Sequence, residues 1–234
     1  MTPLIWPAGA GALALGTLLW GAYDPNSPLF GSAIGRGNRD GRLCYLTFDD
    51  GPNPRATSPI LETLAATGVP ATFFQVGAHV QRFPDDARRV AAAGHEIGNH
   101  TFTHVKLHRR GPARVRAELQ RAHDTIAEVT GRAPRVFRAP HGYRNPFVGR
   151  EVRRLGYSVF GWSFGVWDSA RPGADVIRRR VARGLRPGAI ILLHDGDGYD
   201  PAGDRTQTAA ALPGIIADAR ARGYEFRPLS DLIA

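Results

Sequence analysis

The sequence predicts an α/β protein in which a parallel sheet is covered by helices. From residue 42 onward, short apolar runs alternate with amphipathic stretches, which is typical of this class. The groups of residues able to bind metal or transfer protons each lie at the end of such a run. The 234 residues are an ordinary length for one domain. Since barrels of this class place their chemistry at the carboxyl ends of strands, we expect these groups to meet in one site.

The predicted elements alternate along the whole domain. The first helix is expected to start at Ser58, an N-cap that precedes Pro59 at the first helical position. The predicted strands are Arg42–Phe48, Ala71–Val76, Glu96–Asn99, Val136–Arg138, Ser158–Trp162 and Ala189–Leu193. The predicted helices are Ser58–Thr67, Phe83–Ala93, Pro112–Val129, Arg150–Leu155, Ala174–Arg183 and Thr208–Arg222. Two short segments, Phe226–Pro228 and Ser230–Ile233, close the chain.

The N-terminal part differs in composition from the rest. Leu4–Ala22 has no charged residue and is about as long as a bilayer-spanning helix, so residues 1–22 are interpreted as a signal or anchor segment. Its Ala, Gly and Pro content favours a peripheral segment as an alternative. We expect association with a membrane or export to the cell envelope, and the orientation stays open. Residues 23–41, rich in Pro and Gly, are predicted to be a linker to the domain at 42–234.

Cysteine and charge narrow the function classes. Cys44 is the only cysteine, which excludes a disulfide within the chain and a cysteine-based metal site. The net charge is +9, almost all of it from arginine. No aromatic or glycine-rich binding module accompanies this charge, so we expect no nucleic-acid partner. A positive surface also suits anionic lipid or cell-wall polymer.

Three clusters carry metal-binding and proton-transfer side chains. The first holds the adjacent carboxylates Asp49 and Asp50, which point in opposite directions if the segment is extended, although an ordinary turn is an equal alternative. The second holds His100 and His104, which share a face if the segment is helical. The third ends on His194. One Asp and two His can bind zinc with an open position, which leaves a second Asp and a third His as base and acid. This set indicates a metal-assisted hydrolase.

The order of the motifs resembles the polysaccharide deacetylase family, also called the NodB-homology family. The resemblance extends over roughly residues 42–233 and is carried by Thr47–Asn53, His100–His104, Arg138–Gly142 and Leu192–His194. It implies a distorted (β/α) barrel of the NodB-homology type. It also implies hydrolysis of N-acetyl groups on amino sugars.

The resemblance gives each motif residue a role. Asp49 would be the general base and His194 the general acid that protonates the leaving amine. Arg138 would orient the base, and Asp168 would pair with the acid. The metal ligands would be Asp50, His100 and His104.

Two departures from the family pattern concern substrate contacts. His141 stands where the family usually has an aromatic residue, whose backbone N–H helps to bind the oxyanion. Ser169 follows Asp168 where a Trp is usual, and Trp167 precedes it. Trp162 and Trp167 suit the wall of a sugar groove, and core packing is an equal alternative.

The sequence therefore predicts a metal-dependent carbohydrate N-deacetylase with one divalent ion. Zinc is expected, and cobalt or manganese would also suit two histidines and a carboxylate. The expected substrate is a chitooligosaccharide, peptidoglycan or a lipid-linked amino sugar. The alternatives are an amidase or deformylase of the same family acting on a lipid-linked sugar or a small amide, a catalytically inactive glycan-binding module, and a nucleic-acid binder.

Overall fold

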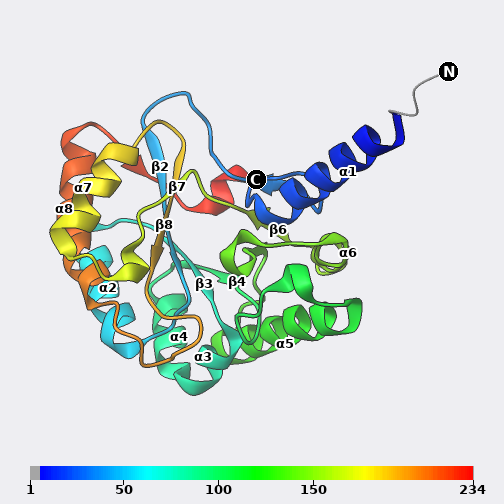
Figure 1. Cartoon of the computed structure of the whole chain (residues 1–234). Helices are drawn as coiled ribbons and strands as arrows, with labels where there is room; N and C mark the ends of the chain where they lie inside the picture. The colour runs from blue at the N-terminus through cyan, green and yellow to red at the C-terminus, as the bar shows by residue number, and fades with distance from the viewer. Residues whose placement is uncertain (1–5, 234) are drawn as a thin grey trace.

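The computed structural model describes residues 6–233, which form a curled parallel sheet with helices around its outside (Figure 1). The strands are β1 (Ala33–Ile34), β2 (Leu43–Asp49), β3 (Thr72–Gln75), β4 (Glu96–Asn99), β5 (Val136–Phe137), β6 (Ser158–Phe160), β7 (Phe164–Gly165), β8 (Ala189–His194) and β9 (Glu225–Phe226). Their order is β1-β6-β5-β4-β3-β2-β8-β7, and β9 pairs with the start of β2. The predicted α/β class and parallel sheet are confirmed.

The centre of the sheet is the pair formed by β2 and β8. The two strands run in parallel from Cys44 beside Ala189 to Asp49 beside His194. Both are near-continuous apolar runs because parallel strands are covered on both faces. Their outer side chains form the main core with those of flanking helices, including Leu46, Phe48, Ile191, Leu193, Ile60 and Leu212. This register places a carboxylate of the first motif next to the histidine of the last.

The helices are α1 (Trp6–Tyr23), α2 (Pro54–Thr67), α3 (Gly77–Arg82), α4 (Pro84–Ala92), α5 (Pro112–Thr130), α6 (Pro146–Arg154), α7 (Ala174–Gly184) and α8 (Thr206–Ala221). Short 3₁₀ turns lie at Leu107–Arg109, Pro140–Gly142, Asp168–Ala170 and Leu229–Leu232. The predicted start of α2 at Ser58 is wrong. Asn53 caps this helix by accepting the N–H of Arg55 at 3.0 Å, and Pro54 is its first residue. Two prolines five residues apart both suit a first turn, and the cap decides between them.

Residues 23–41, predicted as a linker, belong to the folded domain. β1 pairs with β6, and a few residues later Arg36 forms an antiparallel bridge with Ala189 at the start of β8. This segment therefore connects one edge of the curled sheet to β8 and helps to close the barrel. Its Pro and Gly residues mark turns, and a strand of two residues is too short to give a pattern.

The N-terminal helix α1 projects away from the body of the domain (Figure 1). It covers most of the segment predicted as a signal or anchor, of which residues 1–5 lie outside the described residues. Among residues 6–233, no helix combines the length and apolarity that crossing a bilayer requires. Membrane association therefore stays a prediction.

Candidate active site

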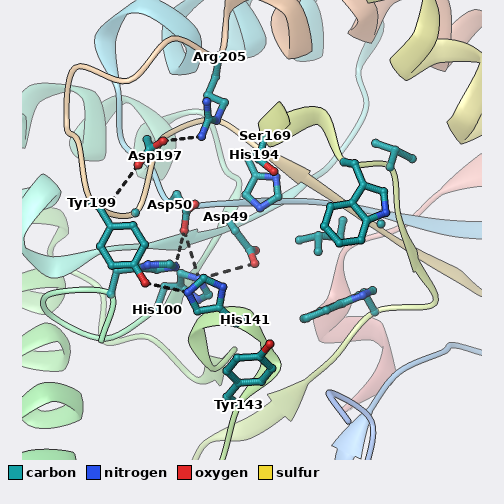
Figure 2. Close-up of a pocket in the computed structure, with 17 residues that line it drawn as sticks. Asp49, Asp50, His100, His141, Tyr143, Ser169, His194, Asp197, Tyr199 and Arg205 are labelled. Atoms are coloured by element: carbon teal, nitrogen blue, oxygen red, sulfur yellow. Dashed lines mark hydrogen bonds and ion pairs between the residues drawn. The ribbon is translucent and has the colours of Figure 1, made fainter. Parts of the chain in front are cut away.

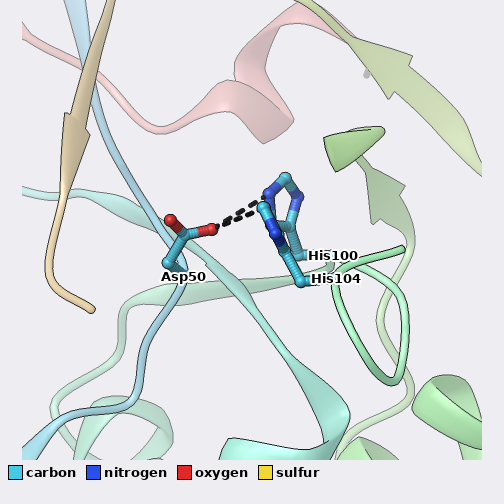
Figure 3. Close-up of side chains that lie close together, drawn as sticks. All are labelled: Asp50, His100 and His104. Carbon is cyan, nitrogen blue, oxygen red and sulfur yellow. Dashed lines mark ion pairs between the residues drawn. The ribbon is translucent and has the colours of Figure 1, made fainter. Parts of the chain in front are cut away.

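Asp50, His100 and His104 converge at the carboxyl ends of β2 and β4 (Figure 3). Asp50 Oδ1 lies 3.0 Å from His104 Nε2 and 3.4 Å from His100 Nε2, and all three side chains are buried. Burial raises the pKa of Asp50, but the neighbouring histidines outweigh it and hold this pKa well below its usual range. The carboxylate is therefore ionised although the residue is buried.

Left-handed backbone at three positions builds this cluster. Asp50 has φ 75°, so the alternation of β2 ends at Asp49, and both carboxylates line the same pocket. The two histidines meet without a helical turn, because their loop contains Thr101 at φ 70° and His104 at φ 53°. Left-handed residues that are not glycine are uncommon and need support from their surroundings.

Glu118 of α5 supplies support for the histidine loop. Its carboxylate accepts the N–H groups of Phe102 and Thr103 at 3.0 and 2.8 Å and the Thr103 hydroxyl at 2.7 Å. Asn99 Oδ1 accepts the N–H of Thr101 at 2.8 Å. These bonds fix the residues between the two imidazoles. The sequence analysis missed Glu118, because a Glu on a helix carries no sign of what it contacts.

The neighbouring carboxylate, Asp49, is held by a buried arginine. Arg138 is fully buried and donates from Nη1 to Asp49 Oδ1 at 2.7 Å and to the Thr47 hydroxyl at 2.8 Å. Its Nη2 donates to the Gly161 carbonyl at 2.8 Å, and the guanidinium lies 4.2 Å from the Phe74 ring centroid. Burial lowers the pKa of Arg138, and the Asp49 carboxylate opposes this effect. The structure thus places Arg138 against Asp49, which is the contact that the family resemblance implies.

His194, which is half-buried, pairs with the buried carboxylate of Asp168. His194 Nδ1 donates to Asp168 Oδ1 at 2.8 Å, and Oδ2 accepts the His194 N–H at 2.8 Å and the Thr208 hydroxyl at 2.9 Å. Burial lowers the pKa of His194, but the Asp168 carboxylate and smaller contributions outweigh it and raise this pKa to about 9. The imidazole is therefore protonated at neutral pH and can donate a proton.

A cavity of about 520 Å³ connects these groups (Figure 2). Eight of the ten predicted site residues line it; the other two, Arg138 and Asp168, bond to Asp49 and His194 from behind. Trp162 lies in its wall, and Trp167, with 76% of its surface exposed, lies at its mouth. Further lining residues that the sequence analysis did not select include Tyr143, Gly165, Val166, Leu192, Asp197, Tyr199 and Arg205.

His141 and Tyr199 form one side of the cavity. A hydrogen bond of 2.8 Å joins His141 Nε2 to the Tyr199 hydroxyl, and both rings pack edge-on against His104, with centroids 5.1 and 4.9 Å away. Gly198 lies so close to the His104 ring that a Cβ would overlap it. His141, which departs from the family pattern, is therefore bonded to Tyr199 from the loop after β8. The two residues are far apart in the sequence, so this contact is visible only in the fold.

Asp195, beside the acid histidine, is a buried carboxyl with no predicted role. Its Oδ2 accepts the Thr57 hydroxyl at 2.6 Å, and its N–H donates to the Asp49 carbonyl at 3.1 Å. Burial raises its pKa to about 7, opposed by the Thr57 hydrogen bond. It packs against Gly51 and so helps to fix the turn that carries both carboxylates.

Three observations fit a divalent metal ion to Asp50, His100 and His104. Their potential ligand atoms all lie within 4.8 Å of one another. Asp50 Oδ1 is buried and receives no hydrogen bond. His100 Nδ1 lies 2.8 Å from the Arg138 carbonyl, to which only a protonated nitrogen can donate, and this leaves the Nε2 lone pair for a metal. Two imidazoles and a carboxylate are a usual set for zinc with an open position.

Comparison with known proteins agrees with this geometry. Residues 36–160 match the family model described as polysaccharide deacetylase. The chain is 42% identical over 215 residues to a chitooligosaccharide deacetylase from Bradyrhizobium sp. (strain ANU 289), an alignment that covers 88% of this chain and 97% of that protein.

Solved structures share the fold. The Bc1960 peptidoglycan N-acetylglucosamine deacetylase superposes with a TM-score of 0.80 at 29% identity, over 85% of this chain and 91% of that one. A family 4 carbohydrate esterase pseudoenzyme from Bacillus anthracis superposes with a TM-score of 0.78 at 28% identity, over 87% of this chain and 69% of that one. The predicted distorted (β/α) barrel is confirmed. On the sequence match and the shared barrel, the chain belongs to the polysaccharide deacetylase family.

Proposed function

We propose that the chain is a metal-dependent hydrolase that removes N-acetyl groups from amino sugars of a polysaccharide or glycoconjugate. The observation that carries the proposal is the convergence, in one cavity, of three sets of side chains. These are a carboxylate held by arginine, a histidine paired to a carboxylate, and an Asp-His-His cluster. A fold likeness alone would not support activity, because a relative of this fold is a pseudoenzyme. The presence of all three sets of side chains in one cavity does support activity.

Asp50, His100 and His104 would hold one divalent ion. Zinc suits this donor set best, and cobalt or manganese also fits. When bound, the ion would supply Lewis-acid polarisation and lower the pKa of a water molecule from about 15.7 towards about 7.

Asp49 would take a proton from the attacking water. Arg138 holds its Oδ1, and Oδ2 lies 3.8 Å from His100 Nε2, beside the metal ligands. The guanidinium fixes the carboxylate in one orientation and leaves the second oxygen for the proton. General-base catalysis of this kind contributes roughly 10²–10⁴ in rate.

His194 would then protonate the leaving amine. Water adds to the amide carbon, the C–N bond breaks, and the nitrogen leaves as a neutral amine only if it receives a proton. Asp168 holds Nδ1 of His194, so Nε2 is the nitrogen left to donate. In this proposal the backbone N–H of His141 helps to bind the oxyanion, with the charge stabilised as the carbonyl becomes tetrahedral.

The aromatic wall supports a sugar substrate. The exposed face of Trp167 at the mouth and Trp162 inside suit the apolar faces of pyranose rings. Relatives named for chitooligosaccharide and for peptidoglycan N-acetylglucosamine support an N-acetylated amino sugar as the substrate class.

Acetate release tests the proposal. Metal-loaded protein should release acetate from at least one of a chitooligosaccharide, peptidoglycan and a lipid-linked N-acetyl amino sugar. Asp49→Asn, which keeps the side-chain size, should retain the metal and lose roughly 10²–10⁴ in turnover. Binding of these glycans with no acetate from any of them would instead identify an inactive glycan-binding module.

A further inference from the structure

Exposed large apolar side chains gather in two places on the molecule. Among the residues whose exposure the structure describes, two of them, Trp167 and Tyr199, lie at the cavity. Six of the others lie on α1 and a seventh, Leu29, packs against it; these seven are Leu13, Leu15, Leu18, Leu19, Trp20, Tyr23 and Leu29. The last, Phe147, lies in the first turn of α6. A soluble domain rarely exposes a continuous apolar surface of this kind without a partner.

The apolar side chains of α1 surround the helix and do not form a single stripe. Leu18 is 52% exposed, and Leu13 and Trp20, which are 75% and 49% exposed, lie on the opposite side of the helix, because consecutive residues point about 100° apart. Leu29 packs against Gly21 and extends the apolar surface to the segment after the helix. A groove on a protein partner would cover one face, whereas a lipid surface accepts apolar side chains on several sides of a helix.

The C-terminal end of α1 and the segment that follows it, residues 22–31, are here called the foot of the helix. A buried arginine bonds this foot to the rest of the domain. The Arg144 N–H donates to the Ala22 carbonyl at 3.0 Å. Its guanidinium donates to the carbonyls of four residues that follow the helix, namely Asp24, Pro25, Ser27 and Gly31. Arg144 is only 1% exposed, so these bonds are shielded from water. The helix is therefore held in one direction and is not a loose tether.

The same foot forms the outer support of the cavity. Asn26 bonds to both backbone groups of Trp162, donating to its carbonyl at 3.0 Å and accepting its N–H at 3.2 Å. The Tyr23 ring packs edge-on against Tyr143 with centroids 5.0 Å apart. Trp162 and Tyr143 both line the cavity. Whatever surface receives α1 is thus held at a fixed place relative to the active-site rim.

A segment with three exposed basic residues lies beside this end of the helix. His108 packs against Tyr23 with ring centroids 5.0 Å apart, and its neighbours Lys106, Arg109 and Arg110 are exposed. Asp24, the acidic residue at the end of the helix, is engaged by Trp20 Nε1 and the Asn26 N–H at 3.0 and 2.7 Å. An apolar helix with basic side chains at its base complements a bilayer whose surface is anionic.

We propose that α1 inserts its apolar side chains into an anionic phospholipid surface and holds the cavity there, so that the substrate is a membrane-linked N-acetyl amino sugar. This substrate class rests on the proposed deacetylase function, whereas the lipid binding does not. The occupant is a lipid surface and not a second copy of the chain, because one partner helix would cover a single side of α1 and leave the exposed apolar side chains of the other side in water.

Vesicle binding tests the first part. Full-length protein should sediment with phosphatidylcholine vesicles that contain phosphatidylglycerol, and more weakly with phosphatidylcholine alone. Leu15→Gln, Leu18→Gln, Leu19→Gln keeps charge and helix propensity and should abolish binding to both. Arg109→Gln, Arg110→Gln should weaken binding to the anionic vesicles by about tenfold or more. The matched control Arg179→Gln, Arg183→Gln on α7 removes the same charge far from α1 and should bind nearly as well as the wild type.

Three results would overturn the lipid surface. The wild type could stay in the supernatant with both vesicles, or the triple Gln variant could bind as well as the wild type. A dimer in solution that the triple Gln variant dissociates would identify a second copy as the occupant.

A pair of substrates tests the second part. One is diacetylchitobiose in solution, and the other is its hexadecyl glycoside incorporated in the anionic vesicles. The wild type should release acetate faster from the vesicle-borne glycoside. The triple Gln variant should lose that gain and keep the rate on the soluble sugar, since none of its three positions lines the cavity. An equal gain for both proteins would overturn the membrane-linked substrate. Vesicle binding without acetate from either sugar would refute the deacetylase function and leave the lipid surface supported.

Discussion

Two histidines in the same cavity are each fixed through Nδ1, but by different partners. His100 Nδ1 lies 2.8 Å from the main-chain carbonyl of Arg138, and His194 Nδ1 lies 2.8 Å from the Asp168 carboxylate. The carbonyl is neutral and orients the ring, which suits a metal ligand. The carboxylate also stabilises the imidazolium, which suits a proton donor. The partner of Nδ1, and not the histidine itself, therefore separates the two roles.

The largest expected effect is on the metal side of this comparison. His104→Ala removes one of three ligand side chains, and purified protein should lose its complement of about one divalent ion per chain together with all deacetylation. Elemental analysis of the purified variant measures the loss. His123→Gln, at a histidine outside the cavity, is the control and should keep the ion. Full metal content in His104→Ala would show that the Asp-His-His cluster is not the metal site.

A substitution of the proposed acid, His194, should lower activity without loss of metal. His194→Ala should lower kcat on an acetamide substrate by roughly 10²–10⁴, because the amine then leaves without a proton. On an ester or an activated anilide, whose leaving group needs little protonation, the loss should be much smaller. Elemental analysis should show an unchanged metal content. Equal losses on both types of substrate would mean that His194 shapes the site and does not donate the proton.

The partner of His194 should set the pH profile. His194 has its pKa raised to about 9 and donates only when protonated, so kcat should fall as the pH rises through that value. Asp168→Asn removes the negative charge that favours the imidazolium, so this basic limb should move to lower pH. Thr208→Val removes one hydrogen bond to Asp168 and keeps the charge, so it should shift the limb less. A limb that stays in place in Asp168→Asn would contradict the pairing.

The smallest effect is expected one contact further from the metal. Glu118→Gln removes the charge that accepts the backbone of the loop between His100 and His104, and metal affinity should fall about tenfold, as is usual for groups that orient ligands. Calorimetric titration of metal-free protein measures the change. Glu128→Gln on the same helix is exposed and serves as the control. An unchanged affinity in Glu118→Gln would mean that the loop holds its shape without this carboxylate.

Much of the barrel was predictable because parallel strands leave a strong local pattern. β2 and β8 are apolar runs that end on Asp49 and His194, which indicates strands covered on both faces, whereas their pairing with each other is seen only in the fold. The start of α2 was not predictable in this way, because Pro54 and Pro59 both suit a first helical turn. β1 was missed for the opposite reason, since two residues are too short to show any periodicity.

The candidate site also has a part that the sequence predicts and a part that it does not. The types and order of the ten predicted residues were available from the sequence, because ligands and proton donors are rare residue types placed at strand ends. Their partners Glu118, Thr208 and Tyr199 were not, because each lies on an element distant in the sequence and is an ordinary residue type where it occurs.

The sequence by itself determined the class of the fold, the family and the set of side chains that meet at the pocket. The tertiary structure alone decided which nitrogen of each histidine is held, which carboxylate oxygen remains free, and how α1 is fastened to the cavity wall through Arg144 and Asn26. The physical reason is that a sequence pattern reports on neighbouring residues, whereas a site depends on contacts between residues far apart in the chain. Periodicity and residue type act within a few positions of the chain, whereas hydrogen-bond direction and burial depend on which distant segments the fold brings together.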